Sequence, residues 1–183
     1  TSDPISTCAN GNGTVTIQLG SSWGNGVDAS ATVNGDELNG VTTTQNGSVL
    51  TVELGNLLTL TSGDYQVVIT LTDETGATQN VTAPITIEPV PSIASQQSPD
   101  NGTAFTDPSI TFSWAASTNV TDYTLQISED ETFASIDFSQ TTTNTSLTTN
   151  VSLEGLLYWR VVANNDCGNA TGSPFNFTLS PNS

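Results

Sequence analysis

The chain has 183 residues, among them 18 Asp or Glu, one Arg and no Lys or His, so its formal charge is −17. A serine or cysteine triad needs an imidazole, a Schiff base needs a lysine amine, and a zinc site without histidine needs more than two cysteines. Clustered Lys and Arg are also what phosphate-rich partners require, which disfavours nucleic acids and anionic membrane surfaces. We expect no enzyme, no cofactor and no catalytic residue, although two carboxylates alone could hydrolyse a glycoside.

The first half of the chain alternates apolar and polar residues with the period of two that half-buried strands show. Strands of this kind are predicted at 14–20, 48–55 and 64–72. Turn-forming residues separate them at 10–13, 33–40, 45–48 and 73–77. The side chains predicted to face inward are Val15, Ile17, Leu19, Leu50, Val52, Leu54, Tyr65, Val67, Ile69 and Leu71.

Prolines at 89, 91 and 99 interrupt this pattern, and a linker is predicted at 88–92. A second set of strands follows, with its own inward side chains: Ile110, Phe112, Trp114, Tyr123, Leu125, Ile127, Ile136, Phe138, Leu157, Trp159, Val161, Ala163, Phe175, Phe177 and Leu179. No window of twelve residues has a helical period. The sequence therefore predicts an all-β fold of two tandem antiparallel β-sandwiches, residues 1–89 and 90–183, each close to the size of an immunoglobulin-like domain.

Several stretches of the second half carry a family resemblance. The succession SPDNG, ITFSWAAS, DYTLQISEDETF, LLYWRVVANNDCG and SPFNFTL resembles fibronectin type III-like modules of secreted multidomain proteins of Bacteroidota. The first half, with STCANGNGTVTIQL and LTSGDYQVVITLTDETGATQNVTAPITI, resembles the Ig-like module that precedes such a domain in those proteins. The resemblance implies accessory regions beside reprolysin-like metalloprotease domains, or segments of large surface adhesins. It identifies a fold more than a function, since sandwich modules serve as stalks, adhesins and sugar binders alike.

Two acidic clusters are candidates for cation binding. Glu129, Asp130 and Glu131 form one, and Asp73 with Glu74 forms the other. Oxygen clusters of this kind could hold Ca²⁺, but neither has the ligand spacing of a calcium loop. We interpret both as solvated turns and predict no metal site.

Aromatic side chains provide the other candidates for ligand contact. Trp114 and Trp159 alternate with apolar neighbours, so core packing is favoured for both over a sugar-binding platform. Trp23 differs because it stands in the glycine-rich loop GSSWGNG, and together with Tyr158 it is the candidate ligand surface. The alternative for Trp23 is packing against its own domain.

Arg160 and the two cysteines are expected to form contacts that stabilise the fold. Arg160 lies between the inward residues Trp159 and Val161, so it should point outward and neutralise a neighbour such as Asp137. Cys8 precedes the turn into the second strand, and in a fibronectin-type topology the loop with Cys167 lies where the chain enters the second domain. We expect a Cys8–Cys167 disulfide, against free buried thiols or pairing with other parts of a longer chain.

Together these features predict a non-catalytic extracellular or cell-surface segment, a spacer or adhesive region of a larger bacterial protein. The N-terminal TSDPISTCANG lacks the regions of a signal peptide, so we expect a mature or excised segment. The expected partners are neighbouring domains of the same polypeptide, with no nucleic acid and no membrane insertion. Two alternatives stay open: a carbohydrate-binding accessory module of a hydrolase with a glycan or protein ligand, and a subunit of a filament that self-associates head to tail.

Overall fold

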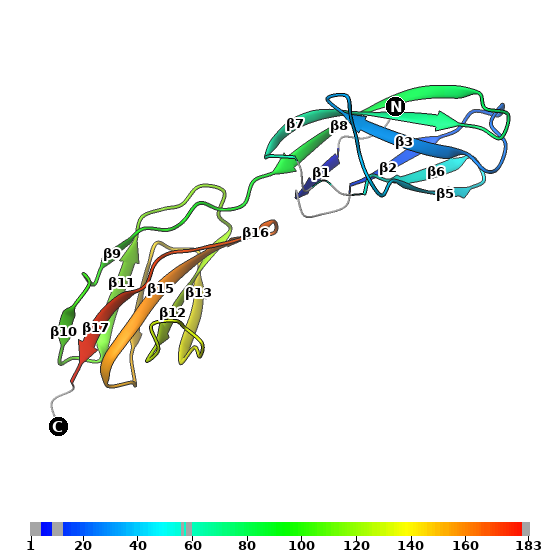
Figure 1. The fold of residues 1–183 in the computed structure, drawn as a ribbon. Coiled ribbons are helices and arrows are strands. Elements are labelled where there is room, and N and C mark those ends of the chain that lie inside the picture. The colour runs from blue at the N-terminus through cyan, green and yellow to red at the C-terminus, as the bar shows by residue number, and fades with distance from the viewer. Residues whose placement is uncertain (1–4, 9–12, 56, 58–59, 181–183) are drawn as a thin grey trace. The chain divides into compact units, whose positions relative to one another are not determined.

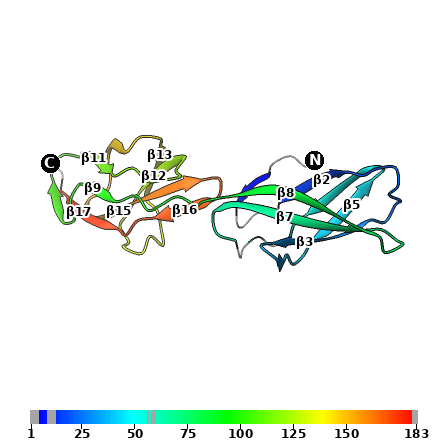
Figure 2. The same ribbon diagram turned by 90° about the horizontal axis from the view of Figure 1, so that it is seen from above.

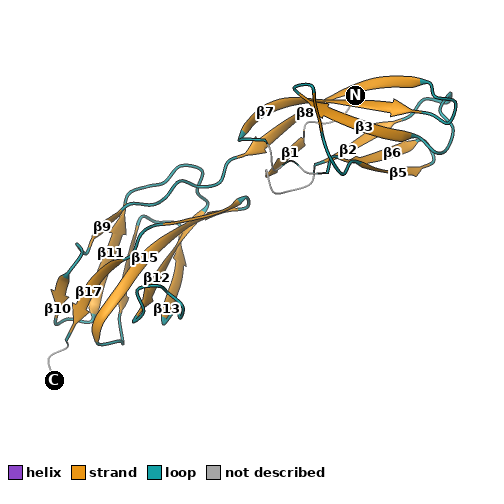
Figure 3. Ribbon diagram, viewed as in Figure 1, coloured by secondary structure: helices purple, strands orange, loops and turns teal. Residues whose placement is uncertain are grey.

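The computed structural model describes residues 5–8, 13–55, 57 and 60–180. In these ranges the chain forms strands, turns and loops without a helix (Figure 3), so none of the described residues belongs to a helix that could cross a membrane. The predicted all-β fold of two β-sandwiches is confirmed. The chain divides into two compact units, Thr1–Pro89 and Val90–Ser183, each with its own core.

Unit 1 pairs a five-stranded sheet with a three-stranded sheet (Figure 1). The larger sheet has the order β1-β8-β7-β3-β4, and the smaller has the order β2-β6-β5. These two strand orders are those of an immunoglobulin-like sandwich. The strands are β1 (Ile5–Cys8), β2 (Thr14–Gln18), β3 (Asp28–Val33), β4 (Asp36–Glu37), β5 (Thr42–Asn46), β6 (Val49–Glu53), β7 (Gly63–Thr72) and β8 (Thr78–Glu88).

The core of unit 1 follows the predicted alternation. Every predicted inward side chain of this unit is buried, except Tyr65, which is half-buried at the margin. Tyr65 keeps its hydroxyl near the surface, where it donates to the carbonyl oxygen of Thr61 at 2.9 Å. The predicted turns at 45–48 and 73–77 connect neighbouring strands, whereas 10–12 of the first predicted turn lie outside the described residues.

The β7–β8 hairpin runs the length of unit 1 (Figure 2). Thr72 pairs with Thr78 beside the turn, and Gly63 pairs with Ile87 at the opposite end. Strand β1 adds to β8 in parallel, with Cys8 opposite Glu88, the last residue of β8. Cys8 therefore lies at the end of unit 1 from which the chain continues toward residue 90.

Unit 2 pairs a three-stranded sheet, β14-β11-β9, with a six-stranded one that contains β10-β17-β15-β12-β13 and, on β15, β16. This is a sandwich of the class to which fibronectin type III modules belong. Its strands are β9 (Gln96–Ser98), β10 (Thr103–Phe105), β11 (Ser109–Trp114), β12 (Asp122–Ser128), β13 (Phe138–Thr142), β14 (Ser146–Asn150), β15 (Gly155–Asn165), β16 (Gly168–Thr171) and β17 (Phe175–Leu179).

Aromatic rings fill much of the core of unit 2. Phe112 contacts Trp159 and Phe177 edge to face, with ring centroids 5.1 and 5.7 Å apart. The prediction that Ile136 faces this core is wrong, because its side chain is 46% exposed. The segment 129–137 forms turns that bond within themselves, so strand β13 begins only at Phe138 and its alternation does not reach back to Ile136.

Candidate functional site

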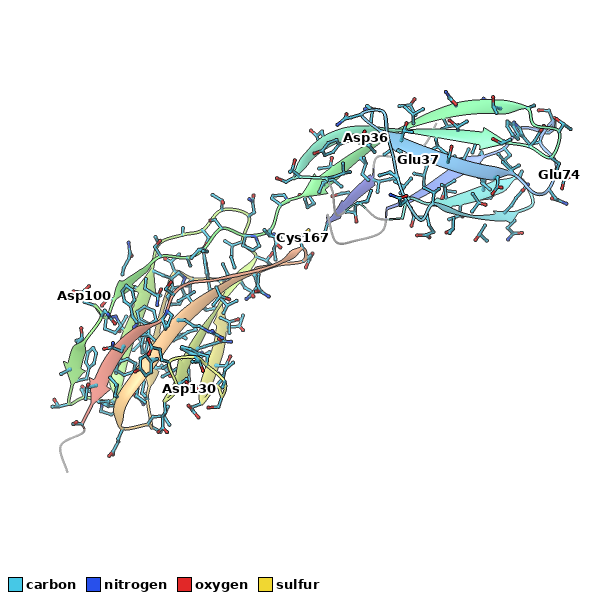
Figure 4. All side chains as sticks on the ribbon, viewed as in Figure 1. Asp36, Glu37, Glu74, Asp100, Asp130 and Cys167 are labelled. Atoms are coloured by element: carbon cyan, nitrogen blue, oxygen red, sulfur yellow. The ribbon has the colours of Figure 1, made fainter. Side chains whose placement is uncertain are left out.

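The β2–β3 loop and the β7–β8 turn lie together at one end of unit 1. The carboxylate of Glu74 in the turn lies against Gly26 in the loop, where an added Cβ would be 2.7 Å from Oε1 of Glu74. Gly26 has a φ of 83°, a conformation that side chains other than glycine rarely adopt. Loops at an end of such sandwiches commonly form ligand-binding surfaces. Figure 4 shows Glu74 at this end, the opposite end of β8 from Glu88.

Trp23 belongs to this loop end. Its backbone N–H donates to the carbonyl oxygen of Gly20 at 3.1 Å, which closes a tight turn within the loop. Its side chain is half-buried and packs against the core of unit 1. The indole is thus fixed on one side by its own domain and keeps a part accessible to solvent.

Gln45 of strand β5 fixes the same loop through its side-chain amide. Nε2 donates to the carbonyl oxygens of Gly24 at 2.8 Å and Gly47 at 3.1 Å, while Oε1 accepts from the N–H of Val27 at 3.3 Å. One side chain therefore satisfies polar backbone groups on both sides of Gly26. The loop that carries Trp23 has a defined shape without a ligand.

A cavity of about 230 Å³ borders Trp23. It lies between β2, an edge strand of the small sheet, and the β7–β8 hairpin of the large sheet. Apolar side chains form its floor and amide and hydroxyl groups its rim; the lining residues are Ile17, Gln18, Leu19, Gly20, Ser22, Trp23, Leu71, Gln79 and Val81. Small-ligand sites usually combine apolar and aromatic side chains with a few polar groups that orient the ligand.

Tyr158, the other residue of the predicted ligand surface, lies in unit 2. It is half-buried on β15, between Ser128 of β12 and Asn176 of β17. Because Trp23 and Tyr158 belong to different units, they do not form one site within a module. Each remains a separate prediction, and only Trp23 lines a described cavity.

The two remaining tryptophans pack in the core of unit 2, as predicted. Trp114 is 1% exposed and Trp159 is 0% exposed. Trp114 contacts the ring of Tyr123, with centroids 5.6 Å apart, and Trp159 contacts that of Phe175 at 6.0 Å. Neither indole offers a face to a ligand.

The acidic candidates for cation binding organise their own turns. Asp73 accepts from the hydroxyl and N–H of Thr75 and from the N–H of Ala77, at 2.6 to 2.9 Å. These bonds, the Thr75 hydroxyl first, lower the pKa of Asp73 below its ordinary value. No group of three or more potential metal ligands occurs among the residues that the structure describes.

Asp130 makes the same kind of bonds in the loop after β12 (Figure 4). Its carboxylate accepts from the N–H and hydroxyl of Thr132 and from the N–H of Ala134. The Thr132 N–H, followed by the Thr132 hydroxyl, lowers the pKa of Asp130. With these lone pairs used inside the loop, its carboxylate serves as a turn cap.

Arg160 lies on the outward face of β15 as predicted, but its neighbours differ from the predicted Asp137. Its Nε donates to Oε1 of Gln126 at 2.8 Å, and its guanidinium lies 4.1 Å from the centre of the Phe133 ring. The carboxylate of Asp137 accepts instead from the N–H of Glu129. The loop 129–137 folds back and covers this part of β15 with an aromatic ring, which the prediction from strand order alone had not included.

Both cysteines, Cys8 and Cys167, are disulfide-bonded, and no free cysteine occurs in the described part of the chain. Cys167 lies in the turn between β15 and β16. Its backbone N–H donates to Oδ1 of Asn165 at 2.9 Å. The side chain of Asn165 in turn donates to the carbonyl oxygen of Asn119. The turn that carries Cys167 is thereby fixed to the β11–β12 loop.

The sequence reasoning missed three glutamines at the Trp23 end, Gln18, Gln45 and Gln79. Gln18 holds an exposed position on the predicted strand 14–20. Gln45 and Gln79 are polar residues on the inward faces of their strands, since they pair in register with the buried Leu50 and Leu71. The signal that could have found Gln45 is its place just before an Asn-Gly turn, opposite a glycine-rich loop. No comparable signal marks Gln79, because its place beside the cavity depends on strand β2 lying next to the β7–β8 hairpin.

Comparisons with known proteins give no family: no family model matches the chain, and no curated protein matches it. Solved structures with similar folds include the chicken CNTN1 FN1–FN3 domains, at 15% identity and a TM-score of 0.46, covering 98% of this chain and 66% of that one. A titin Ig tandem has 14% identity and a TM-score of 0.36, covering 99% and 94%. Dimeric latent PorU from Porphyromonas gingivalis has 12% identity and a TM-score of 0.39, covering 100% and 19%. By its strand orders the chain is a tandem of two β-sandwich modules.

Proposed function

We propose that this chain is a non-catalytic extracellular spacer or adhesive segment of a larger secreted or surface protein of the Bacteroidota type, with neighbouring domains of its polypeptide as partners. The observation that carries the proposal is the bonded state of both cysteines in a tandem of sandwich modules. Disulfides persist in oxidising compartments, which supports a location outside the cytoplasm. The absence of His and Lys from the sequence supports a role without imidazole or amine catalysis.

The disulfide that we propose is Cys8–Cys167, since the chain has only these two cysteines. Contacts within each unit support it. Cys8 pairs in register with Glu88, the last strand residue before the linker. In unit 2, a Cβ on Gly168, the neighbour of Cys167, would lie 3.4 Å from Cγ1 of Val90, the first residue of that unit. Each cysteine thus lies near the residue at which its own unit meets the linker.

This bond would give the spacer a specific response to tension. It would enclose residues 9–166 in a covalent loop that contains every strand of the two sandwiches except β1, β16 and β17. A force applied to the two ends of the chain would then pass through residues 1–8, the disulfide and residues 167–183. The load would reach the sandwiches only through β1, β16 and β17, and residues 9–166 would add no length under tension whether or not they stay folded.

Single-molecule stretching between the two termini tests this function. The oxidised chain should show only a short extension, that of residues 1–8 and 167–183, because residues 9–166 would lie inside the covalent loop. After reduction, or in a Cys8→Ser, Cys167→Ser variant, unfolding should release a chain length on the order of 500 Å, at roughly 3.3–3.6 Å per residue. Unfolding steps of that total length in the oxidised protein would contradict the proposed role.

The cavity beside Trp23 favours one second function, a carbohydrate-binding accessory module. Aromatic and amide side chains around a shallow cavity suit a sugar, whose ring has both apolar faces and hydroxyl groups. A glycan array with the intact chain tests this function. Specific retention of at least one glycan class would support it, and the absence of retention would leave the spacer role alone.

A further inference from the structure

We propose that the cavity beside Trp23 binds a single neutral sugar ring, stacked on the exposed part of the indole and hydrogen-bonded by Gln18 and Gln79. This inference rests on the second function above and names its site and ligand class. The site lies in unit 1, at the end remote from Glu88, so that a ligand there would not meet the point at which the chain leaves the unit.

The size of the cavity sets the size of the ligand. Its volume of about 230 Å³ is below the range of roughly 300–1,000 Å³ typical of drug-sized ligand sites. It corresponds to about seven or eight water molecules at roughly 30 Å³ each. One six-membered sugar ring is of this order, whereas an extended oligosaccharide would have to continue outside the cavity.

The apolar and polar groups of the cavity match the two kinds of surface that a sugar ring presents. Trp23, which is half-buried against the core, lines the cavity, and its backbone is held by Gly20. Around it, the side chains of Gln18, Ser22 and Gln79 have no hydrogen-bond partner among the residues that the structure describes. Two amides and one hydroxyl provide both donors and acceptors, which is what neighbouring sugar hydroxyls require.

The charges near the cavity favour a neutral sugar over an anionic one. Asp73 and Glu74 line a neighbouring hollow together with Ser22, which also lines the cavity. The only arginine of the chain lies on β15 in unit 2, and there is no lysine. A uronate or sialic acid would therefore meet carboxylates without a cationic partner. The ligand should be uncharged.

The loop is already ordered for binding. Gln45 holds the backbone on both sides of Gly26, and Glu74 closes the far side of the loop. A preorganised site loses little conformational freedom on binding, so even a small ligand can be held. For a single sugar ring we expect a Kd on the order of 1 mM.

The experiment is a titration of the intact chain, followed by the indole N–H signals in ¹H–¹⁵N NMR spectra. Three such signals are expected from three tryptophans, two of them from buried rings, and the Trp23→Phe variant identifies the third. The probes are D-glucose, D-galactose, D-mannose, D-xylose and N-acetyl-D-glucosamine, with D-glucuronate as the anionic comparison. Saturable movement of the Trp23 signal by a neutral sugar, with D-glucuronate at least tenfold weaker, is the expected result.

Matched variants separate a site effect from a folding effect. Trp23→Ala removes the stacking surface but also removes core contacts, so its fold is checked by the dispersion of the remaining signals. Gln79→Ala changes an exposed side chain of β8 and should weaken binding at least tenfold with the fold intact. Gln66→Ala changes an exposed glutamine of β7, five register positions from the Leu71–Gln79 pair, and should bind like the parent chain.

The outcomes distinguish the site from the function. If a glycan is retained on the array but the Trp23 signal does not move, and Gln79→Ala binds as well as Gln66→Ala, the site is wrong while carbohydrate binding stands. If no glycan is retained and no probe moves the Trp23 signal, both the site and the second function are wrong. Equal binding of D-glucuronate would overturn the neutral ligand class.

Discussion

The guanidinium of Arg160 lies over the ring of Phe133, 4.1 Å from its centre, in a chain that has no other cationic side chain. Phe133 is buried and has a φ of 55°, a left-handed conformation that is uncommon for a bulky residue. Its N–H donates to the carbonyl oxygen of Asp130. The arginine thus holds a strained turn residue of the loop 129–137 against strand β15.

Removal of this contact should destabilise unit 2 to a modest degree. Arg160→Met keeps the aliphatic length but loses the charge and the bond to Gln126, and we expect a loss of about 1–2 kcal/mol. A double-mutant cycle with Phe133→Leu should give a coupling energy of about 0.5–1 kcal/mol between the two side chains. Chemical denaturation measures both values.

The matched control for that cycle is Asp137→Asn, the partner that strand order alone predicts. It should show no coupling with Arg160→Met, because the Asp137 carboxylate bonds to the N–H of Glu129. If the coupling energy of Arg160 with Asp137 is larger than that with Phe133, an ion pair and not the contact with the ring stabilises this part of unit 2.

The lowered pKa of Asp130 makes a pH-dependent contribution to stability. A carboxyl group whose pKa is lower when folded stabilises the protein above its unfolded value, near 3.8, and loses that effect as the pH falls through the folded pKa. The difference in unfolding free energy between the parent chain and Asp130→Asn should be greatest near neutral pH and disappear in that acidic window. Denaturation at a series of pH values measures it.

Asp100→Asn provides the control for charge alone. No hydrogen bond to the Asp100 carboxylate occurs among the described residues, yet the substitution changes the net charge by the same amount. Its effect should reflect only reduced repulsion within the chain. If Asp130→Asn and Asp100→Asn show the same pH profile, the turn cap makes no contribution of its own.

Salt should stabilise the protein. With a formal charge of −17, repulsion among carboxylates opposes the compact state, and about 0.1 M salt screens charges more than about 10 Å apart. The melting temperature should therefore rise from low to moderate NaCl concentration at neutral pH. The rise should become smaller below about pH 3, where most carboxyl groups are protonated; a flat or falling melting temperature at neutral pH would refute the argument.

The strands could be predicted from the sequence because burial of one sheet face imposes a period of two. Val15, Ile17 and Leu19 show this period, and so do Leu125 and Ile127. Such patterns report which face is buried and not which strands are neighbours. They say nothing of loops that fold back on themselves, as 129–137 does.

The candidate site could be predicted only in part for the same reason. Trp23 was identified because an aromatic residue among glycines contradicts the composition of an ordinary loop. Gln45 and Gln79 come from other strands, and they approach Trp23 only through the pairing of β5 with β6 and of β7 with β8. Register and sheet order are long-range properties that alternation alone does not determine.

The most direct test of the central claim, that one covalent bond joins the two modules of a spacer, is tryptic digestion of the unfolded and unreduced chain. Because Arg160 is the only Arg or Lys, trypsin can cut only after it, between Cys8 and Cys167. With a Cys8–Cys167 bond, residues 1–160 and 161–183 stay joined, and mass spectrometry shows the intact mass plus one water until reductant separates the fragments. Two separate fragments without reductant, or a disulfide-linked dimer, would contradict the account.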